Sequence, residues 1–79
     1  MSDALNRLRW RCQRGMLELD HILRGFLDTA YPDAAPAMQR AFEALLAMAD
    51  ADMLDLIMGR TEARSAEMAD LLILLRRHE

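Results

Sequence analysis

Apolar residues recur with the period of an α-helix between Leu19 and Leu27, and this periodicity constrains the fold more than any other feature of the chain. The i, i+3, i+4, i+7 spacing is formed by Leu19, Ile22, Leu23, Phe26 and Leu27. Side chains at these intervals share one face of a helix, so the segment needs other elements against which to bury that face. Because a residue before proline is disfavoured in the α conformation, this helix should end near Tyr31-Pro32.

The composition favours further helices as partners for this face. The chain has 79 residues, of which 53% are hydrophobic and 5% aromatic, and it contains only three glycines and two prolines. These few breaks, together with abundant Leu, Met and Ala, are typical of helices, and the length allows a single domain. We therefore expect an all-α fold, a small compact five-helix bundle that forms one domain over residues 1–79.

Two helical segments are predicted on either side of this central one. The first would face the core with Leu5, Leu8 and Cys12. The segment after Pro32 has Asp33 as a plausible N-cap and Pro36 in its first turn, where proline is tolerated. Its buried stripe would consist of Met38, Ala41, Phe42, Leu45 and Met48.

Two shorter apolar patterns complete the chain. A fourth helix, capped by Asp50 or Asp52 and stopped by Gly59, would carry Met53, Leu54, Leu56 and Ile57. Ser65 is the expected N-cap of the last helix. Its inward-facing residues would be Met68, Leu71, Leu72 and Leu75, and its C-terminal dipole would be complemented by Arg76, Arg77 and His78.

The stretch from Trp10 to Asp20 is the most unusual part of the sequence. At 100° per residue, the side of the first helix opposite its apolar face would carry Arg7, Trp10, Arg11 and Arg14. A large ring among arginines on an exposed side indicates a contact surface; alternatively, Trp10 packs over a neighbouring helix and the arginines are a solvated face. Gly15 would separate two helices because it can adopt positive φ.

Charge is unevenly distributed along the chain. The net charge is −3, but Met1 to Arg14 carries four arginines and one acid, and the remainder carries six arginines and twelve acids. An acidic chain with one short basic strip is a poor candidate for nucleic-acid binding, which requires neutralisation of many phosphates. The basic end more plausibly meets an acidic patch on another protein.

No membrane or secretory segment is expected. The longest aliphatic run extends from Leu71 to Leu75, far short of the roughly 20 residues that span a bilayer. Because Met1 to Trp10 lacks the apolar block of a secretory signal, we expect a cytoplasmic protein without membrane insertion. The single cysteine agrees with a reducing compartment.

The residues offer little for catalysis. Glu18-x-x-His21 has the spacing of half a carboxylate-bridged metal site, but one copy on a polar face is not enough. Cys12 on an apolar face reads as a small core residue, since no spacing brings His21 or His78 to it as a base. The chain also lacks a glycine-rich dinucleotide-binding loop. We therefore predict that it is not an enzyme in its own right.

Several short motifs together resemble those of one known family. They are Trp10, the run Arg14-Gly15-Met16-Leu17-Glu18-Leu19-Asp20, Phe26, Tyr31, Phe42-x-x-Leu45-Leu46 and Asp50-x-Asp52. In this order they resemble the SdhE family, the succinate dehydrogenase flavinylation factors of bacteria, over roughly Asn6 to Arg77. The family's Arg-Gly-x-x-Glu signature carries over as Arg14, Gly15 and Glu18. A tryptophan usual in the fourth helix is replaced by Leu56, and many members have basic residues at Gln13 and Leu17.

The resemblance implies a small all-α protein that binds the flavoprotein subunit of succinate dehydrogenase, and sometimes that of fumarate reductase. It implies that the protein promotes covalent attachment of FAD to a histidine of that subunit, so FAD would act on the partner and would not be bound stably by this chain. The hypothesis assigns partner binding to Arg7, Trp10, Arg11, Arg14, Gly15, Leu17, Glu18 and Asp20. Arg14 would bind a partner carboxylate, and Glu18 would accept from a partner donor or hold Arg14 in position.

Two other functions fit the same residues. One is an antitoxin-like or cytoskeleton-linked small protein, and the other is a structural helical subunit of some other complex, in which Gly15 is only a tight turn. Neither involves flavin. The sequence predicts no particular oligomeric state.

Overall fold

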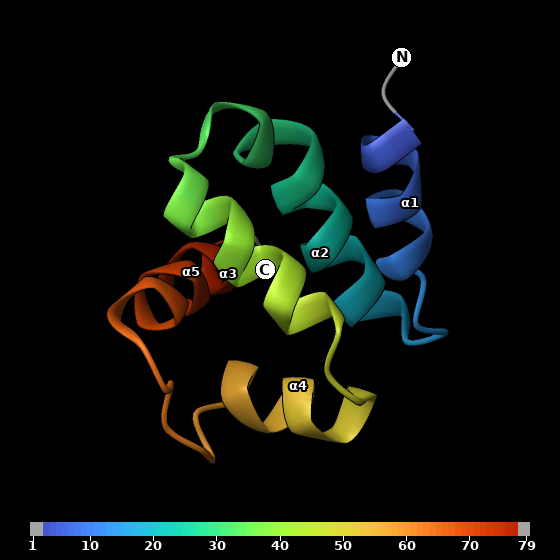
Figure 1. Cartoon of the computed structure of the whole chain (residues 1–79). Coiled ribbons are helices and arrows are strands. Elements are labelled where there is room, and N and C mark those ends of the chain that lie inside the picture. The colour runs from blue at the N-terminus through green and yellow to red at the C-terminus, as the bar shows by residue number, and fades with distance from the viewer. Residues whose placement is uncertain (1–2, 78–79) are drawn as a thin grey trace.

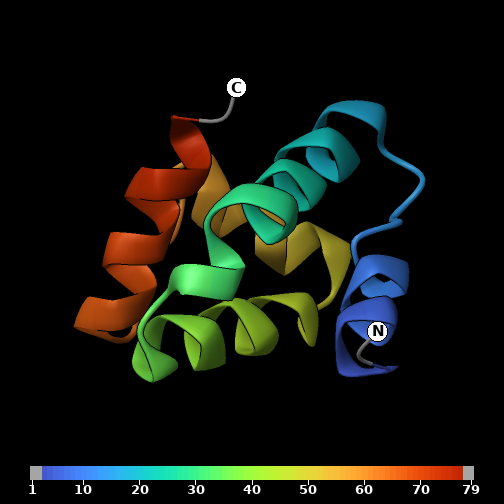
Figure 2. The same ribbon diagram turned by 90° about the horizontal axis from the view of Figure 1, so that it is seen from above.

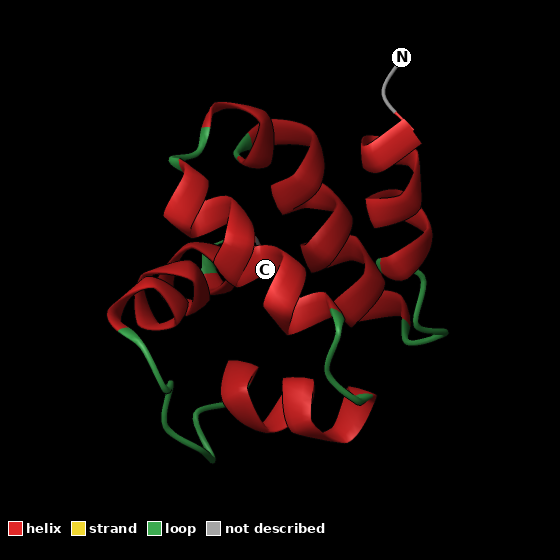
Figure 3. Ribbon diagram, in the orientation of Figure 1, coloured by secondary structure: helices red, strands yellow, loops and turns green. Residues whose placement is uncertain are grey.

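The computed structural model describes residues 3–77, and these residues form α-helices joined by short connections (Figures 1 and 3). The elements are α1 (Asp3–Arg11), α2 (Leu17–Thr29), a 3₁₀ helix η1 (Tyr31–Asp33), α3 (Pro36–Leu46), α4 (Asp50–Ile57) and α5 (Ala66–Arg76). No strand occurs among the described residues. The all-α, five-helix prediction is therefore confirmed.

The core lies between α2, α3 and α5, where the apolar stripes of the three helices meet (Figures 1 and 2). The rings of Phe26 and Phe42 are fully buried, with centroids 4.8 Å apart, and the Tyr31 ring lies 5.5 Å from Phe42. The predicted stripe of α2 is buried throughout. In α5, Leu71, Leu72 and Leu75 are buried, as the sequence predicts.

Helices α1 and α4 pack on this core from different sides. α1 contacts α2 and α3, and buries Leu8 and Cys12. An ion pair of 3.0 Å between Arg9 and Asp28 also joins α1 to α2. α4 packs on α5, and the Arg76 guanidinium donates to the carbonyls of Ile57 and Leu56 at 3.0 and 3.1 Å. Arg76 thus also caps the C-terminus of α4, while His78 lies outside the described residues.

Two of the predicted helix ends are confirmed and two are wrong. Ser65 Oγ accepts from the Met68 amide at 3.1 Å, and Gly59 follows α4 with φ +79°. The predicted N-cap at Asp33 is wrong because Asp33 belongs to the 3₁₀ helix Tyr31–Asp33, and α3 begins only at Pro36, with Ala35 as its N-cap. Asp50 and Asp52 lie in the first turn of α4, whose N-cap is Ala49.

In the described part of the chain, every helix is too short or too polar to cross a lipid bilayer. The longest of the helices, α2, has 13 residues.

Candidate partner-docking site

The connection between α1 and α2 contains a glycine in the left-handed conformation. α1 ends at Arg11, and Gly15 has φ +77°, a value that residues with a Cβ rarely adopt. Gly15 is exposed, and a Cβ built on it would meet no atom within 4 Å. The glycine is therefore required by the backbone, and it also leaves an open notch on the surface.

Asp20 fixes the shape of this connection. Its carboxylate accepts from the backbone amide of Arg14 at 2.7 Å and from that of Gly15 at 3.2 Å. A carboxylate in the first turn of α2 is also favoured by the positive end of the helix dipole. Asp20 is thus bonded within the junction, and its contact with a partner stays a prediction.

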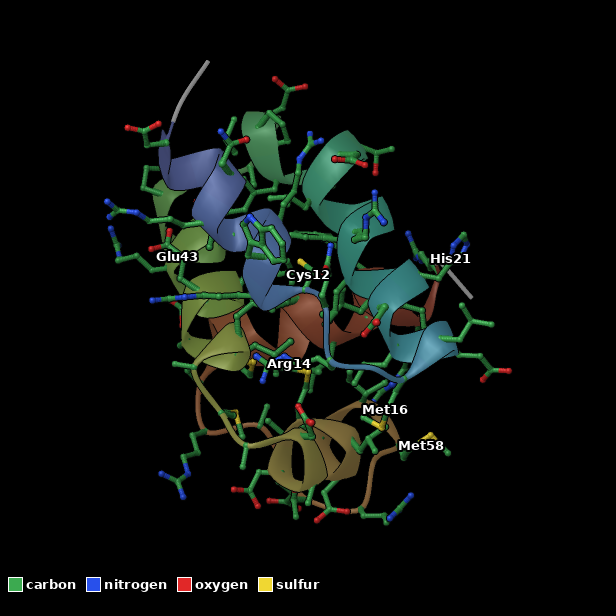
Figure 4. The ribbon with its side chains drawn as sticks, turned by 90° about the vertical axis from the view of Figure 1, so that its right-hand side faces the viewer. Cys12, Arg14, Met16, His21, Glu43 and Met58 are labelled. Atoms are coloured by element: carbon green, nitrogen blue, oxygen red, sulfur yellow. The ribbon has the colours of Figure 1, made fainter. Side chains whose placement is uncertain are left out.

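Arg14 points inward and holds two connections together. Its guanidinium donates to the carbonyls of Met48 at 3.2 Å and of Leu46, and to the Asp50 carboxylate at 3.1 Å. Only 16% of the side chain is exposed. In Figure 4, Arg14 lies between the α1–α2 connection and the start of α4.

The expectation that Arg14 shares an exposed side with Arg7, Trp10 and Arg11 is therefore wrong. α1 ends at Arg11, so the rotation of 100° per residue no longer applies at Arg14, and the chain turns its side chain toward α3 and α4. The ion-pair partner of Arg14 is Asp50. Of the two roles predicted for Glu18, holding Arg14 in position is wrong, because no hydrogen bond or ion pair joins Glu18 to Arg14 within residues 3–77.

The other six predicted docking residues are exposed. They are Arg7, Trp10, Arg11, Gly15, Leu17 and Glu18. Trp10 is 72% exposed and Leu17 is 88% exposed, values that are unusual for large apolar side chains and that indicate a contact surface. For Trp10, this excludes the alternative of packing over a neighbouring helix of the same chain.

A shallow hollow of about 690 Å³ lies beside the glycine notch. It runs along the exposed side of α2, where its walls include Gly15, Leu17, His21 and Arg24. His21 points away from the core in Figure 4. The hollow and the notch together form a concave surface of mixed polarity.

Comparison with known proteins shows the family to which the chain belongs. A family model described as the flavinator of succinate dehydrogenase matches residues 6–79. The chain belongs to this family.

Curated relatives support the same assignment. A protein from Idiomarina loihiensis is 36% identical over 84% of this chain and 73% of its own length. A second, from Methylococcus capsulatus, is 39% identical over 89% of this chain and 84% of its own length, and a third, from Pseudomonas savastanoi pv. phaseolicola, is 41% identical over 81% and 76%. All three are named FAD assembly factor SdhE, a name for an assembly factor and not for a catalytic enzyme. No solved structure matches the chain significantly.

The three residues of the Arg-Gly-x-x-Glu motif differ in exposure. Of Arg14, Gly15 and Glu18, only the last two are exposed, whereas Arg14 faces the carbonyls of the α3–α4 connection. Leu56, where the resemblance expects tryptophan, is almost fully buried in α4. Leu17 offers an apolar side chain at the edge of the hollow.

The sequence does not indicate that Asp50 is a partner of Arg14. Asp50 belongs to the motif Asp50-x-Asp52, but the two bonded residues are 36 positions apart, and no spacing rule relates them. The carbonyls of Leu46 and Met48 carry no sequence signal, because every residue has one.

The positions of Cys12, Glu18 and His21 do not favour nucleophilic catalysis or metal binding. Cys12 is fully buried, and burial raises the pKa of its thiol to about 11, so the reactive thiolate is scarce at neutral pH. Glu18 and His21 are exposed. In the part of the chain that the structure describes, no three metal-binding side chains come together.

Proposed function

We propose that this chain binds the flavoprotein subunit of succinate dehydrogenase and promotes covalent attachment of FAD to it. The family description and the names of the relatives support a role in FAD assembly. The single structural observation that carries the proposal is the glycine notch, which is open to solvent and lies in the connection that follows the helix of the exposed Trp10.

The proposed docking surface combines three kinds of contact. Gly15 allows another backbone to approach closely because it has no side chain. Trp10 and Leu17 supply apolar area, and a buried tryptophan is a common centre of binding energy. Arg7 and Arg11 attract an acidic region of the flavoprotein and accelerate its association.

The chain would act by positioning. Bound at this surface, it would favour the conformation of the flavoprotein in which the acceptor histidine lies within reach of the flavin, and the linkage would form on the partner. Arg14 and Asp20 would contribute indirectly, since they hold the notch in shape. The chain would bind no cofactor stably and would work in the cytoplasm.

The test is co-expression of Gly15 variants with the flavoprotein subunit in a host that lacks its own assembly factor. Covalent FAD is measured by in-gel flavin fluorescence. Asparagine tolerates the left-handed conformation better than other residues with a Cβ, so Gly15→Asn adds a side chain to the notch with little backbone strain. We expect covalent FAD to fall roughly tenfold or more, as for loss of a central contact.

The matched control is Gly59→Asn. Gly59 has φ +79°, nearly the same as Gly15, but it lies after α4 and away from the junction. This variant should keep normal covalent FAD. Equal losses in the two variants, or no loss in Gly15→Asn, would contradict the docking assignment. Repeating the experiment with the flavoprotein subunit of fumarate reductase tests whether that enzyme is served too.

A further inference from the structure

A second hollow lies between α3, α4 and the connection that leads to α5. Its volume is about 600 Å³, within the range of pockets that hold small molecules or large side chains. Its apolar wall consists of Ala44, Met48, Leu56 and Met68. Methionine side chains adapt to varied partners, so this wall suits an inserted apolar group. We call this hollow the α3–α4 groove.

The rim of the α3–α4 groove is acidic. Asp52, Asp55 and Glu62 contribute carboxylates, and Arg64 contributes one guanidinium. Asp55 is paired with Arg60 at 3.2 Å, whereas Asp52 and Glu62 have no bonded partner within residues 3–77. An apolar floor with an excess of carboxylates at its edge favours an apolar side chain flanked by cations.

The same chain presents such a group on α1. Trp10 is 72% exposed, and Arg7 and Arg11 are exposed beside it without an ion-pair partner among the described residues. Arg9 is the arginine of α1 that is paired, with Asp28. Tryptophan flanked by arginines is chemically complementary to the α3–α4 groove, in both apolar area and charge.

Position excludes insertion within one molecule. In Figure 1, α1 lies at one edge and the connection from α4 to α5 at the opposite lower edge, and Figure 2 also shows α1 and α5 on opposite sides. We propose that the occupant of the α3–α4 groove is Trp10 of a second copy of this chain, flanked by that copy's Arg7 and Arg11. The contact is heterologous, so copies associate head to tail.

Self-association of this kind hides Trp10, Arg7 and Arg11. If these residues also dock the flavoprotein, which rests on the proposed function, self-association competes with docking. Associated chains would then bind the flavoprotein only after they dissociate. The association itself does not depend on that function, so purified protein suffices to test it.

The experiment is sedimentation velocity of the purified chain from about 10 µM to about 1 mM, where small interfaces associate. We expect the average mass to rise with concentration from the 9.0 kDa monomer and to rise less in about 0.5 M salt, which screens the charges. Trp10→Ala should remain monomeric. Ala44→Arg, which places a cation in the groove from an exposed helical position, should also remain monomeric.

A mixture of the two variants gives the decisive result. Trp10→Ala keeps an intact groove and Ala44→Arg keeps an intact Trp10, so together they should form a 1:1 dimer that cannot grow further. Ala69→Arg, an exposed position on α5 outside the groove, controls for charge and should associate like the unmodified chain. A chain that stays monomeric at about 1 mM, or a mixture that does not dimerise, would overturn the proposal.

Discussion

The Arg14 guanidinium donates to two carbonyls and one carboxylate at once, through the fixed set of donors on its planar group. Its neighbour Gly15 makes no side-chain contact and instead leaves space. The two adjacent residues therefore act differently. Arg14 stabilises the junction through its bonds, whereas Gly15 leaves open space at the surface of that junction. Their contributions can be separated by measuring stability and flavin attachment in the same variants.

Substitution of Arg14 should reduce stability. Arg14→Ala leaves the carbonyls of Leu46 and Met48 and the Asp50 carboxylate without their donor, and hydrogen bonds to charged groups are each worth about 1.5–3 kcal/mol. We expect the free energy of unfolding in urea to fall by at least that amount. Arg14→Lys should recover only part of it. Arg11→Ala, at an exposed arginine of α1, should change it by less than about 0.5 kcal/mol. Equal effects at Arg14 and Arg11 would show that the inward bonds contribute nothing.

Gly15→Ala tests the backbone alone. Alanine at φ +77° is strained by about 1–2 kcal/mol, although its methyl group would meet open space. We expect thermal unfolding of Gly15→Ala at a lower temperature than that of Gly15→Asn, in which the strain is smaller. The opposite order would mean that φ is not what restricts this position.

Among the elements, α5 depends most clearly on the N-cap residue that precedes it, Ser65. Ser65 accepts from the Met68 amide, and α5 supplies Leu71, Leu72 and Leu75 to the core. Ser65→Ala should therefore cost about 1 kcal/mol of unfolding free energy, the usual value of an N-cap. Thr61→Ala, exposed in the same connection, is the control and should have little effect. Urea denaturation followed by circular dichroism measures both, and indistinguishable curves would contradict the role of the cap.

The whole molecule should lose stability in alkali. Burial raises the pKa of Cys12 from 9.0 to about 11. Burial, with the hydrogen bond to Glu43 and its charge, raises the pKa of Tyr31 from 10.0 to about 12. Because both folded pKa values are higher than the unfolded ones, the folded state keeps protons that the unfolded chain has lost. Stability from these groups is complete below pH 9.0 and falls as the pH rises toward 12.

The measurement is the free energy of unfolding in urea at a series of pH values. Cys12→Ala should lack the decrease that begins near pH 9.0 but keep the one that begins near pH 10.0 from Tyr31. The comparison uses the slope of the unfolding free energy against pH, so a constant loss of stability caused by the smaller alanine side chain does not affect it. A slope unchanged by Cys12→Ala between these two pH values would refute the assignment.

By itself, the sequence determined the helical class, the buried stripes of α2 and α5, the glycine at the junction and the Ser65 cap. These depend on residues within one or two helical turns, where periodicity and local hydrogen bonds are decisive. Helical geometry also predicts that Trp10 lies opposite the apolar face of α1, but only the tertiary structure decides that its ring is exposed and does not pack over a neighbouring helix.

Only the tertiary structure decided the orientation of Arg14. Its partners lie where α3 ends and α4 begins, more than 30 residues away, and two of them are backbone carbonyls that no sequence pattern marks. The helix cap predicted at Asp33 failed for a different, local reason: the 3₁₀ helix Tyr31–Asp33, which includes Pro32, is not revealed by the periodicity. Local spacing determines which face a helix buries, whereas the contacts made beyond a helix end depend on how distant segments pack.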